Sequence, residues 1–339
     1  MSRSCSMGNN ILDFTEKWAH TELMSDHATL RDAILYFAEF EHCKDFMVQL
    51  RWPDGQIICP RCGGEKLCWV EKQRLWKCYA GHKQPTFTLK TGTIFEDSPI
   101  ALEKWLPATW LLLNCKNGIS SYEIARDLGV TQKTAWFMLG RIRLAMQDEE
   151  TGGKLGGPGI EVEADETFIG GKARNMHPAR RNDMRERGNF GKTIVSAVLE
   201  RHGKVRATVV PNRRKKAIQA HLRDHVEPGS TVYSDELLSY DGLDEYKHQV
   251  INHAETYVNG QIHTNGMENF WSLLKRGLKG TYIAVEPFHL FRYVDEQAFR
   301  FNNREMDDVH RFVIGMKQIV GRRLTYAQLT GKAEVTQHG

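Results

Sequence analysis

Four of the seven cysteines of this chain lie close together, between Cys59 and Cys78. The run Cys59-Pro-Arg-Cys62-Gly-Gly has the spacing of a zinc knuckle, and its glycines permit the sharp turn that two chelating thiolates need. Fifteen residues separate Cys62 from Cys78, which suits a four-ligand zinc ribbon. We expect His82 to be the fourth ligand, with Cys68 as its competitor. One structural zinc ion would then fold a small module that lacks a core of its own, whereas the alternative is that these cysteines are small buried apolar residues.

An odd number of cysteines, crowded in this way, favours a metal site in a reducing compartment over a disulfide framework. Residues 1–10 lack the apolar core of a secretion signal, and the longest strongly apolar stretch, around residues 110–113, is too short to span a bilayer. We therefore expect a cytoplasmic protein with no membrane partner. The length of 339 residues suggests two or three domains, and a chain of this length can bury a sizeable core without disulfides.

A helix-turn-helix motif is predicted after the cysteine-rich region. Helical spacing of apolar residues runs through residues 102–113 and returns after Ser120, which can cap a helix together with a glutamate three residues later. Gly129 suits the left-handed turn that ends this helix, and Thr131 can cap the next one, which is expected to reach about Met146. Two short helices around a Leu-Gly-Val turn are typical of the DNA-binding motif.

The second helix of this motif would enter a major groove of DNA. Gln132 and Lys133, and also Arg141, are then candidates to reach the DNA. The alternative is that the aromatic residues of this helix pack a purely structural bundle. Elsewhere, three tryptophans are expected to be core residues rather than platforms for stacking bases: Trp105, Trp110 and Trp271.

Positive charge is concentrated in one region, although the net charge of the chain is only +4. The region from Gly171 to Arg223 holds 15 lysines and arginines against 3 acidic residues. A solvated surface usually mixes the two signs, so this region indicates a polyanionic partner, and we expect that partner to be nucleic acid. Arg213 and Arg214 are expected to grip phosphates and to make binding strongly salt-dependent. A basic loop that only keeps the protein in solution is the alternative.

A glycine-rich stretch, Gly152–Gly159, reads as a linker, and the pattern beyond it turns β-like. Three predicted strands, a helix and a fourth strand follow, an order that fits the opening of a ribonuclease-H-like domain but also occurs in unrelated α/β folds. The segments are residues 160–169, 193–199, 205–210, 215–226 and 231–234. From about residue 265 onward the chain is expected to be mostly helical.

Three positions in this region carry acidic residues that could serve as metal ligands. Strand alternation puts Asp165 and Glu163 on one face and Glu166 on the other. Asp235 directly follows a predicted strand, and Glu268 lies where a helix begins. Two strand carboxylates and one helix carboxylate could hold two divalent ions for an in-line phosphoryl displacement, and oxygen ligands favour Mg²⁺ or Mn²⁺. Each residue alone also has an ordinary explanation, as a turn residue or a helix N-terminal acid.

With these residues in view, the sequence resembles insertion-sequence DDE transposases, in particular the ISXO-like group that carries an N-terminal zinc ribbon. The resemblance spans about residues 30–310, and the last of its segments is the most specific. The segments are Cys59–Cys62, Lys90–Pro99, Asp127–Met138, Asp165–Lys172, Ser234–Leu237 and His263–Gly277.

The resemblance implies a ribonuclease-H-like catalytic domain in which Asp165, Asp235 and Glu268 hold two Mg²⁺ or Mn²⁺ ions. It also implies that Lys275, with Arg276 beside it, contacts DNA near the cut. His263 and Asn265 match the family segment before the glutamate without a defined role. The sequence departs from the group at Cys78-x3-His82, where a second Cys-x2-Cys pair is usual.

The implied activity is DNA transposition. A phosphodiester at the end of the element would be hydrolysed, and the freed 3′-OH would be joined to target DNA. The partners would be double-stranded DNA, both terminal inverted repeats and target, and a second copy of the chain in a homodimer or larger oligomer. The alternatives are a sequence-specific DNA-binding regulator with an inert catalytic domain and a nuclease for RNA–DNA hybrids.

These inferences divide the chain into six expected parts. A helical N-terminal region and a zinc ribbon come first, followed by the helix-turn-helix region, a linker, the α/β catalytic domain and a tail. Their expected bounds are residues 1–51, 52–97, 98–150, 151–159, 160–325 and 326–339.

Overall fold

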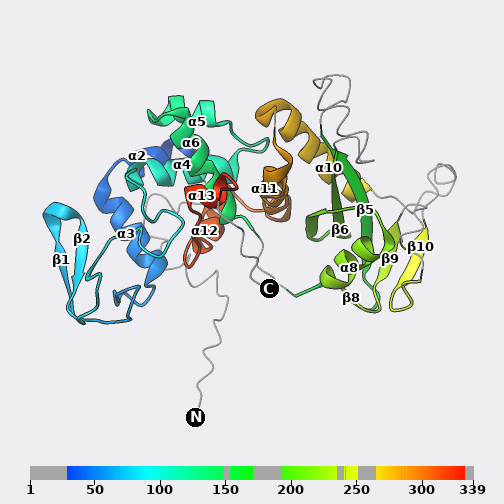
Figure 1. The fold of residues 1–339 in the computed structure, drawn as a ribbon, viewed down its shortest axis with the longest axis horizontal. Coiled ribbons are helices and arrows are strands. Elements are labelled where there is room, and N and C mark those ends of the chain that lie inside the picture. The colour runs from blue at the N-terminus through cyan, green and yellow to red at the C-terminus, as the bar shows by residue number, and fades with distance from the viewer. Residues whose placement is uncertain are drawn as a thin grey trace, which may run out of the picture. The chain divides into compact units, whose positions relative to one another are not determined.

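The computed structural model describes residues 29–147, 153–170, 192–234, 240, 242–250, 265–283 and 285–332. The chain divides into two compact units, which Figure 1 shows as ribbons. Unit 1 comprises Met1–Cys115, Ser121–Ala145 and Glu305–Gly339, and unit 2 comprises Lys116–Ser120 and Met146–Arg304. Within the described residues, no helix combines the length and the apolar character that crossing a membrane requires.

Helices form the larger part of unit 1. Their common core is aromatic: the rings of Phe37, Phe46 and Trp110 each lie within 6 Å of the ring of Phe312, at centroid distances of 5.7, 5.5 and 5.2 Å. This core joins helices that are far apart in the sequence. The helices are α2 (Leu30–Tyr36), α3 (Phe40–Arg51), α4 (Leu102–Asn114), α5 (Ser121–Leu128), α6 (Gln132–Leu144), α12 (Asp308–Lys317) and α13 (Tyr326–Leu329).

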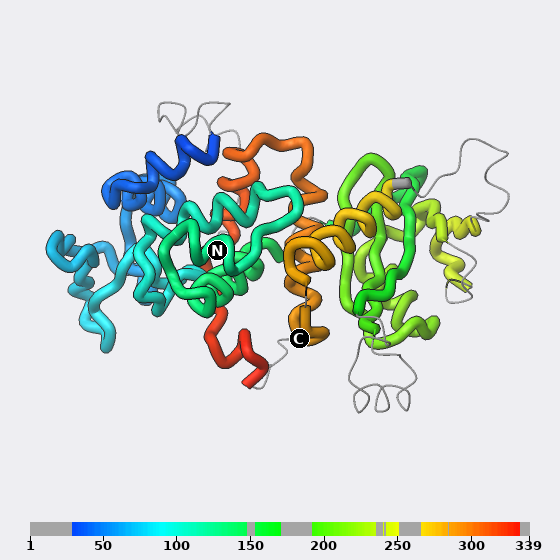
Figure 2. The backbone as a smooth tube through the Cα atoms, turned by 90° about the horizontal axis from the view of Figure 1, so that it is seen from above, coloured from blue at the N-terminus to red at the C-terminus, as the bar shows by residue number. Residues whose placement is uncertain are grey.

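The C-terminal segment belongs to unit 1, which corrects the expected domain 160–325 and the expected tail 326–339. Helix α12 packs against α3 and α4, and Thr93 forms an antiparallel bridge with Val320. Helix α13 packs on α6. Figure 2 shows this red segment among the blue and green elements of unit 1. The sequence predicted that this segment is helical, but which of the two units it joins depends on the non-local packing of Phe312.

A small antiparallel sheet forms the zinc-ribbon part of unit 1. It consists of β1 (Leu67–Val70), β2 (Leu75–Cys78) and β3 (Thr86–Phe87), in the order β1-β2-β3. Trp76 is buried and its ring packs on the rings of Phe87, Trp52 and Trp69. Beyond these rings the sheet buries little, so it depends on additional links between its loops.

Unit 2 is built on a five-stranded sheet in the order β10-β9-β5-β6-β7. Strands β5, β6 and β7 are antiparallel neighbours, whereas β9 is parallel to β5 and β10 is parallel to β9. The strands are β5 (Glu161–Ile169), β6 (Thr193–Glu200), β7 (Val205–Val210), β9 (Thr231–Ser234) and β10 (Lys247–Val250).

Helices cover both faces of this sheet. Alternate residues of the strands enter two different cores: Val198 packs with Ile218 and Leu222 of α8, whereas Ala197 packs with Phe270 of α10 and Val294 of α11. Unit 2 is therefore a three-layer α/β structure (Figure 1). Its helices are α8 (Lys215–His225), α10 (Asn265–Gly277) and α11 (Leu290–Asn302), with a π-helical turn η6 (Leu278–Tyr282) and a 3₁₀ turn η7 (Pro287–His289).

The stretch expected as a linker, 151–159, contributes to unit 2. Its residues Leu155–Gly156 form β4, which pairs in parallel with β8 (Val226–Glu227). Leu155 is 6 % exposed and lies in the core on the α8 face. Gly156 has φ 83°, and a Cβ there would lie 2.4 Å from Oγ of Ser230. This glycine therefore allows a close approach of two chain segments rather than flexibility.

Candidate functional sites

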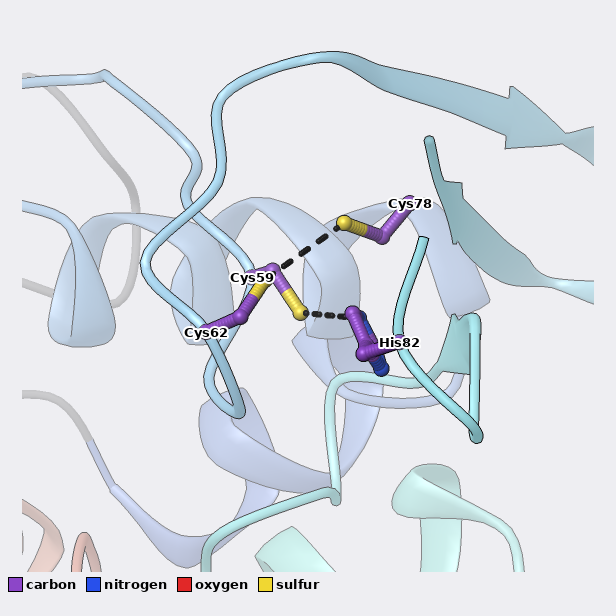
Figure 3. Close-up of side chains that lie close together, drawn as sticks. All are labelled: Cys59, Cys62, Cys78 and His82. Atoms are coloured by element: carbon purple, nitrogen blue, oxygen red, sulfur yellow. Dashed lines mark hydrogen bonds between the residues drawn. The ribbon is translucent and has the colours of Figure 1, made fainter. Parts of the chain in front are cut away.

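The four predicted zinc ligands come together in the ribbon. Sγ of Cys59 lies 3.4 Å from Nε2 of His82, and Sγ of Cys62 lies 3.7 Å from Sγ of Cys78. All four ligand atoms lie within 4.8 Å of one another, and their side chains point toward a common centre (Figure 3). No other group of three or more such residues with this geometry occurs in the part of the chain that the structure describes. Cys68 is exposed and lies outside the cluster.

Backbone turns aim these side chains. The amide of Gly63 donates to the carbonyl of Cys59 at 2.8 Å, and the amide of Cys59 donates to the carbonyl of Gly64 at 3.0 Å. Gly63 has φ 69°, a conformation that favours glycine. A Cβ on Gly64 would lie 3.3 Å from Sγ of Cys62, so this position also keeps room for the thiol. The knuckle therefore needs both of its glycines.

The ligand chemistry suits structural zinc. The pKa of the Cys59 thiol is lowered: burial acts to raise it, but hydrogen bonds from the backbone of Arg61 and Cys62 and from neighbouring thiols outweigh burial. A thiolate is the form that binds metal. Three sulfur ligands and one imidazole form the closed, four-ligand set of structural zinc sites, with no position left for a substrate.

The predicted carboxylates on β5 lie against α10. Asp165 accepts a hydrogen bond from the indole Nε1 of Trp271 at 2.8 Å through Oδ2, and Oδ1 accepts from the backbone amide of Glu166 at 2.7 Å. Glu163 accepts from the backbone amide of Met267 at 3.0 Å. Asp165 and Glu163 therefore share the α10 face of the sheet, as strand alternation predicted.

Glu268 lies in the first turn of α10 and is exposed to solvent. Burial is the main cause that raises the pKa of Glu163, and the negative charge of Glu268 adds to it. The charge of Glu268 is therefore felt electrostatically at Glu163. Glu163 and Asp165 thus lie on the α10 face of β5, and Glu268 lies in the first turn of that helix.

Glu166 points to the opposite face of the sheet. Its side chain is 1 % exposed, and Oε2 lies 3.8 Å from Nε of Arg213. The hydroxyl of Tyr240 donates a hydrogen bond to Oε1. The guanidinium of Arg213 also lies over the ring of Phe168, 5.3 Å from its centroid. Arg213 is thus half-buried beside a carboxylate, whereas Arg214 is exposed at the N-cap of α8.

Two predicted site residues, Asp235 and His263, lie outside the described residues. Strand β9 ends at Ser234, one residue before Asp235, and β9 is the parallel neighbour of β5. Most of the basic segment expected to meet DNA, residues 171–191, also lies outside them. Asn265 is the first residue of α10.

The last turn of α10 carries the predicted DNA contacts Lys275 and Arg276. Lys275 is half-buried and Arg276 is exposed. Lys275 follows Glu268 by seven residues, close to two helical turns, so both residues lie toward the same side of the helix.

Helices α5 and α6 form the predicted two-helix turn. Gly129 has φ 59°, and the side chain of Thr131 caps α6 by accepting from the amide of Thr134. At the start of α6, Gln132 donates to Oγ of Ser121 at 2.8 Å. Lys133 is exposed, with its ammonium 5.3 Å from the ring centroid of Tyr326.

The expectation that Arg141 could reach DNA is wrong. Arg141 is 4 % exposed, and its guanidinium donates to the backbone carbonyls of Ile94, Glu96 and Leu324. These carbonyls belong to irregular segments of unit 1, where no helix or strand supplies a backbone donor, so a buried side chain has to donate the hydrogen bonds. Arg141 is therefore a structural residue.

Sequence reasoning missed the contacts of Trp271. It assigned Trp271 to the core, and the residue is 5 % exposed, but its indole N–H binds Asp165. The available signal was helical spacing, because Trp271 follows Glu268 by three residues and so lies on a neighbouring face of the same helix. The buried partner of an indole N–H, however, is decided by tertiary packing.

Comparisons with known proteins match both halves of the chain. Residues 41–84 match a family model described as a transposase zinc-ribbon domain, and residues 154–302 match one described as an ISXO2-like transposase domain. A Halobacterium salinarum protein named as an uncharacterized protein in transposable element ISH50 is 29% identical over 255 residues, which cover 71% of this chain and 84% of that protein. An uncharacterized transposase-like protein of Haemophilus influenzae is 37% identical over 105 residues, 30% of this chain and 85% of that protein.

Proposed function

Because this chain belongs to the insertion-sequence transposases that combine a zinc ribbon with an ISXO2-like transposase domain, we propose that it is a DDE transposase that cuts DNA at element ends and joins them to target DNA. The observation that carries the proposal is the α10 face of β5, where Asp165 and Glu268 lie on elements joined by hydrogen bonds. A transposase needs such a group of carboxylates, whereas a DNA-binding regulator does not.

The fold of unit 2 supports a ribonuclease-H-like assignment. The sequence predicted three strands, a helix and a fourth strand for that fold. In unit 2, three antiparallel strands are followed along the chain by α8 and then by β9, which is parallel to β5. The first strand, β5, occupies the centre of the sheet and carries Asp165. Since β9 lies next to it in parallel, we propose that Asp235, directly after β9, joins Asp165 at the same edge of the sheet.

Asp165, Asp235 and Glu268 would hold two Mg²⁺ or Mn²⁺ ions, since carboxylate oxygens are the ligands that these cations prefer. When bound, such ions supply Lewis acidity and lower the pKa of an attacking water. The protein itself holds the carboxylates at fixed positions: Asp165 through Trp271 and the Glu166 amide, and Glu268 through the anchored start of α10.

The reaction would run as two displacements at phosphorus. In the first, water attacks a phosphodiester at the element end, the bond between phosphorus and the 3′ oxygen breaks, and a 3′-OH is released. In the second, that hydroxyl attacks a phosphodiester of the target, and the new DNA–DNA bond replaces the broken one. Lys275 and Arg276, at the end of α10, would contact the phosphates of the bound DNA and position them.

Duplex recognition would involve the other basic and polar positions. Gln132 and Lys133 begin α6, where a recognition helix contacts bases and phosphates. Arg214 is exposed and would bind phosphate, whereas Arg213 would have to share its charge between DNA and Glu166. Joining two element ends calls for at least a dimer on DNA.

The decisive experiment uses purified protein with Mg²⁺ and a plasmid that carries the gene with its native flanks. We expect new 3′ ends at the boundaries of an inverted repeat, and we expect Glu268→Gln to abolish them. Specific binding to these ends with no cutting or joining under Mg²⁺ or Mn²⁺ would replace the transposase proposal with that of a regulator whose catalytic domain is inert.

A second variant tests the role of Asp165 directly. Asp165→Asn replaces a charged ligand by a neutral amide of the same size, so we expect cleavage to fall below detection while DNA affinity stays within about twofold of wild type. Gel-shift and cleavage assays on the same DNA measure both. Mg²⁺-dependent cleavage that persists in this variant would remove Asp165 from the metal-binding group.

A further inference from the structure

Helix α10 is attached to β5 by two hydrogen bonds from residues one helical turn apart. The backbone amide of Met267 donates to Glu163, and the indole of Trp271 donates to Asp165. We propose that Glu163 and Trp271 are positioning residues of the carboxylate site: they bind no metal, and they set the geometry of Glu268 and Asp165. This inference rests on the proposed function and adds to it residues with a defined mechanical role.

Glu163 is placed to hold the start of the helix. Met267 lies in the first turn of α10, where backbone amides have no partner within the helix, and its amide donates to Oε2 of Glu163 at 3.0 Å. A carboxylate at a helix N-terminus also interacts favourably with the helix dipole. Because Glu268 follows Met267 in the chain, fixing the amide of Met267 fixes the backbone that carries Glu268.

The other side of Glu163 is occupied as well. Its Oε1 lies 3.4 Å from Nε of Arg201, and Arg201 also donates to Glu161 at 2.5 Å. The guanidinium lies over the ring of Tyr233, whose hydroxyl donates to Glu161 at 2.8 Å. Glu163 is 3 % exposed. With a donor on each oxygen and almost no solvent contact, it is a buried anchor rather than an open metal ligand.

Close approach of α10 to the sheet depends on Gly266. A Cβ at this position would lie 2.4 Å from Cδ2 of Leu199 and 3.3 Å from Oε2 of Glu163. Both neighbours belong to the sheet, one on β6 and one on β5. The glycine therefore lets the first turn reach the carboxylate of Glu163, which a larger residue would push away.

Trp271 performs the equivalent task for Asp165. Its ring is buried against Phe270, with centroids 5.1 Å apart, so the direction of its N–H is set by packing. That N–H meets Oδ2 of Asp165 at 2.8 Å, while the Glu166 amide holds Oδ1. Two donors from rigid elements hold the plane of the carboxylate. Loss of such an outer partner typically weakens metal binding by 10- to 100-fold.

The test measures Mn²⁺ binding to the full-length, zinc-loaded protein by calorimetry, with Mn²⁺-dependent cleavage as a second readout. Trp271→Phe keeps a buried ring and deletes the N–H donor, so we expect Mn²⁺ affinity to fall by at least about tenfold. Cleavage by this variant should recover at high Mn²⁺, whereas Asp165→Asn should not recover at any concentration.

Trp105→Phe is the matched control. Trp105 is fully buried in unit 1, and its indole donates to Oγ of Ser98 at 3.2 Å. The Trp105→Phe variant also loses an indole hydrogen bond, but at a position away from the carboxylates, so its Mn²⁺ affinity should equal that of the wild type. Equal Mn²⁺ affinity of Trp271→Phe and Trp105→Phe would overturn the positioning role of Trp271.

Glu163 is tested with a graded pair of variants. Glu163→Gln retains an oxygen that can accept from Met267, whereas Glu163→Ala retains none, so we expect Mn²⁺ affinity to decrease from wild type to Gln to Ala. If both variants fold and bind Mn²⁺ as wild type does, Glu163 has no positioning role. If the wild-type protein binds Mn²⁺ but cuts no DNA, the proposed function is overturned. The positioning roles of Glu163 and Trp271 are then judged only by comparing the Mn²⁺ affinities of the variants with that of the wild type. Wild type that binds no Mn²⁺ would overturn both.

Discussion

Three buried polar side chains show how tertiary contacts accommodate polar groups in the interior of this protein. Arg141 donates to three backbone carbonyls, and burial lowers its pKa from the usual value. Glu163, with its pKa raised by burial, keeps a donor on each oxygen. His221 is 5 % exposed on α8, and its Nδ1 lies 3.1 Å from Oγ of Ser196. The structural role of each of these residues follows from the groups that it contacts and not from its residue type.

His221 predicts a pH dependence of stability. Burial, with the neighbouring His225 adding to it, lowers the pKa of His221 to about 3, whereas an unfolded histidine titrates near 6.5. The unfolded chain therefore binds the proton more readily, so stability is full above about pH 6.5 and is lost as pH falls toward 3. The expected slope approaches about 1.4 kcal/mol per pH unit.

Urea denaturation at pH 7, 6 and 5 measures this slope. His221→Gln should flatten it, because glutamine keeps a hydrogen-bonding group for Ser196 and takes up no proton. His202→Asn is the control, since His202 is exposed and its φ of 61° is one that asparagine tolerates. An unchanged slope in His221→Gln would show that other groups cause the acid sensitivity.

At the scale of the elements, the zinc ribbon has little apolar packing of its own, and we expect a bound metal ion to stabilise it. Its sheet has only short strands, and β3 is two residues long. The ligands flank the β1–β2 hairpin in the sequence: Cys59 and Cys62 precede β1, Cys78 ends β2, and His82 lies between β2 and β3. A metal ion held by all four therefore closes the module, as a disulfide would in an oxidising compartment.

Zinc removal is expected to unfold the ribbon. Purified protein should contain one zinc per chain, and Cys78→Ser or a strong chelator should lower this content and change the fluorescence of Trp76. Cys68→Ser is the matched control and should keep its zinc, because Cys68 is exposed outside the cluster. Zinc content by atomic absorption decides the matter. A full zinc complement in His82→Ala combined with loss in Cys68→Ser would show that the ligand set is wrong.

At the scale of the whole molecule, the two units are interleaved along the chain. The chain enters unit 2 briefly at Lys116–Ser120, leaves unit 1 again after Ala145 to build the rest of unit 2, and returns to unit 1 at Glu305. The return segment places Phe312 in the aromatic core of unit 1. Unit 1 is therefore complete only after the rest of the chain has been synthesised.

A matched pair of core truncations tests this division. Phe312 and Phe270 are both fully buried, the first in unit 1 and the second in unit 2. Each change to alanine should cost about 3–5 kcal/mol of the stability of its own unit. Hydrogen exchange should show Phe312→Ala lowering protection in residues 30–115, 121–145 and 305–332 of unit 1, and Phe270→Ala lowering it in residues 153–304 of unit 2. Loss of protection throughout the chain in both variants would show that the units unfold together.

Sequence alone determined the features that depend on local spacing. The two-residue gap between Cys59 and Cys62 predicted the knuckle, and apolar periodicity predicted α4 and α6 near their observed bounds. Strand alternation placed Glu163 and Asp165 on one face of β5. These signals are readable because a turn, a helix or a strand repeats its geometry within a few residues.

Tertiary structure alone decided which apolar and polar faces meet. Only the folded chain shows that α12 packs in unit 1, that Leu155 enters the sheet core, and that Arg141 is buried. It also shows the indole of Trp271 on Asp165. The physical reason is that periodicity identifies a face that must be covered but not its partner, because many faces of similar hydrophobicity compete and the outcome depends on the shape of the whole packed core.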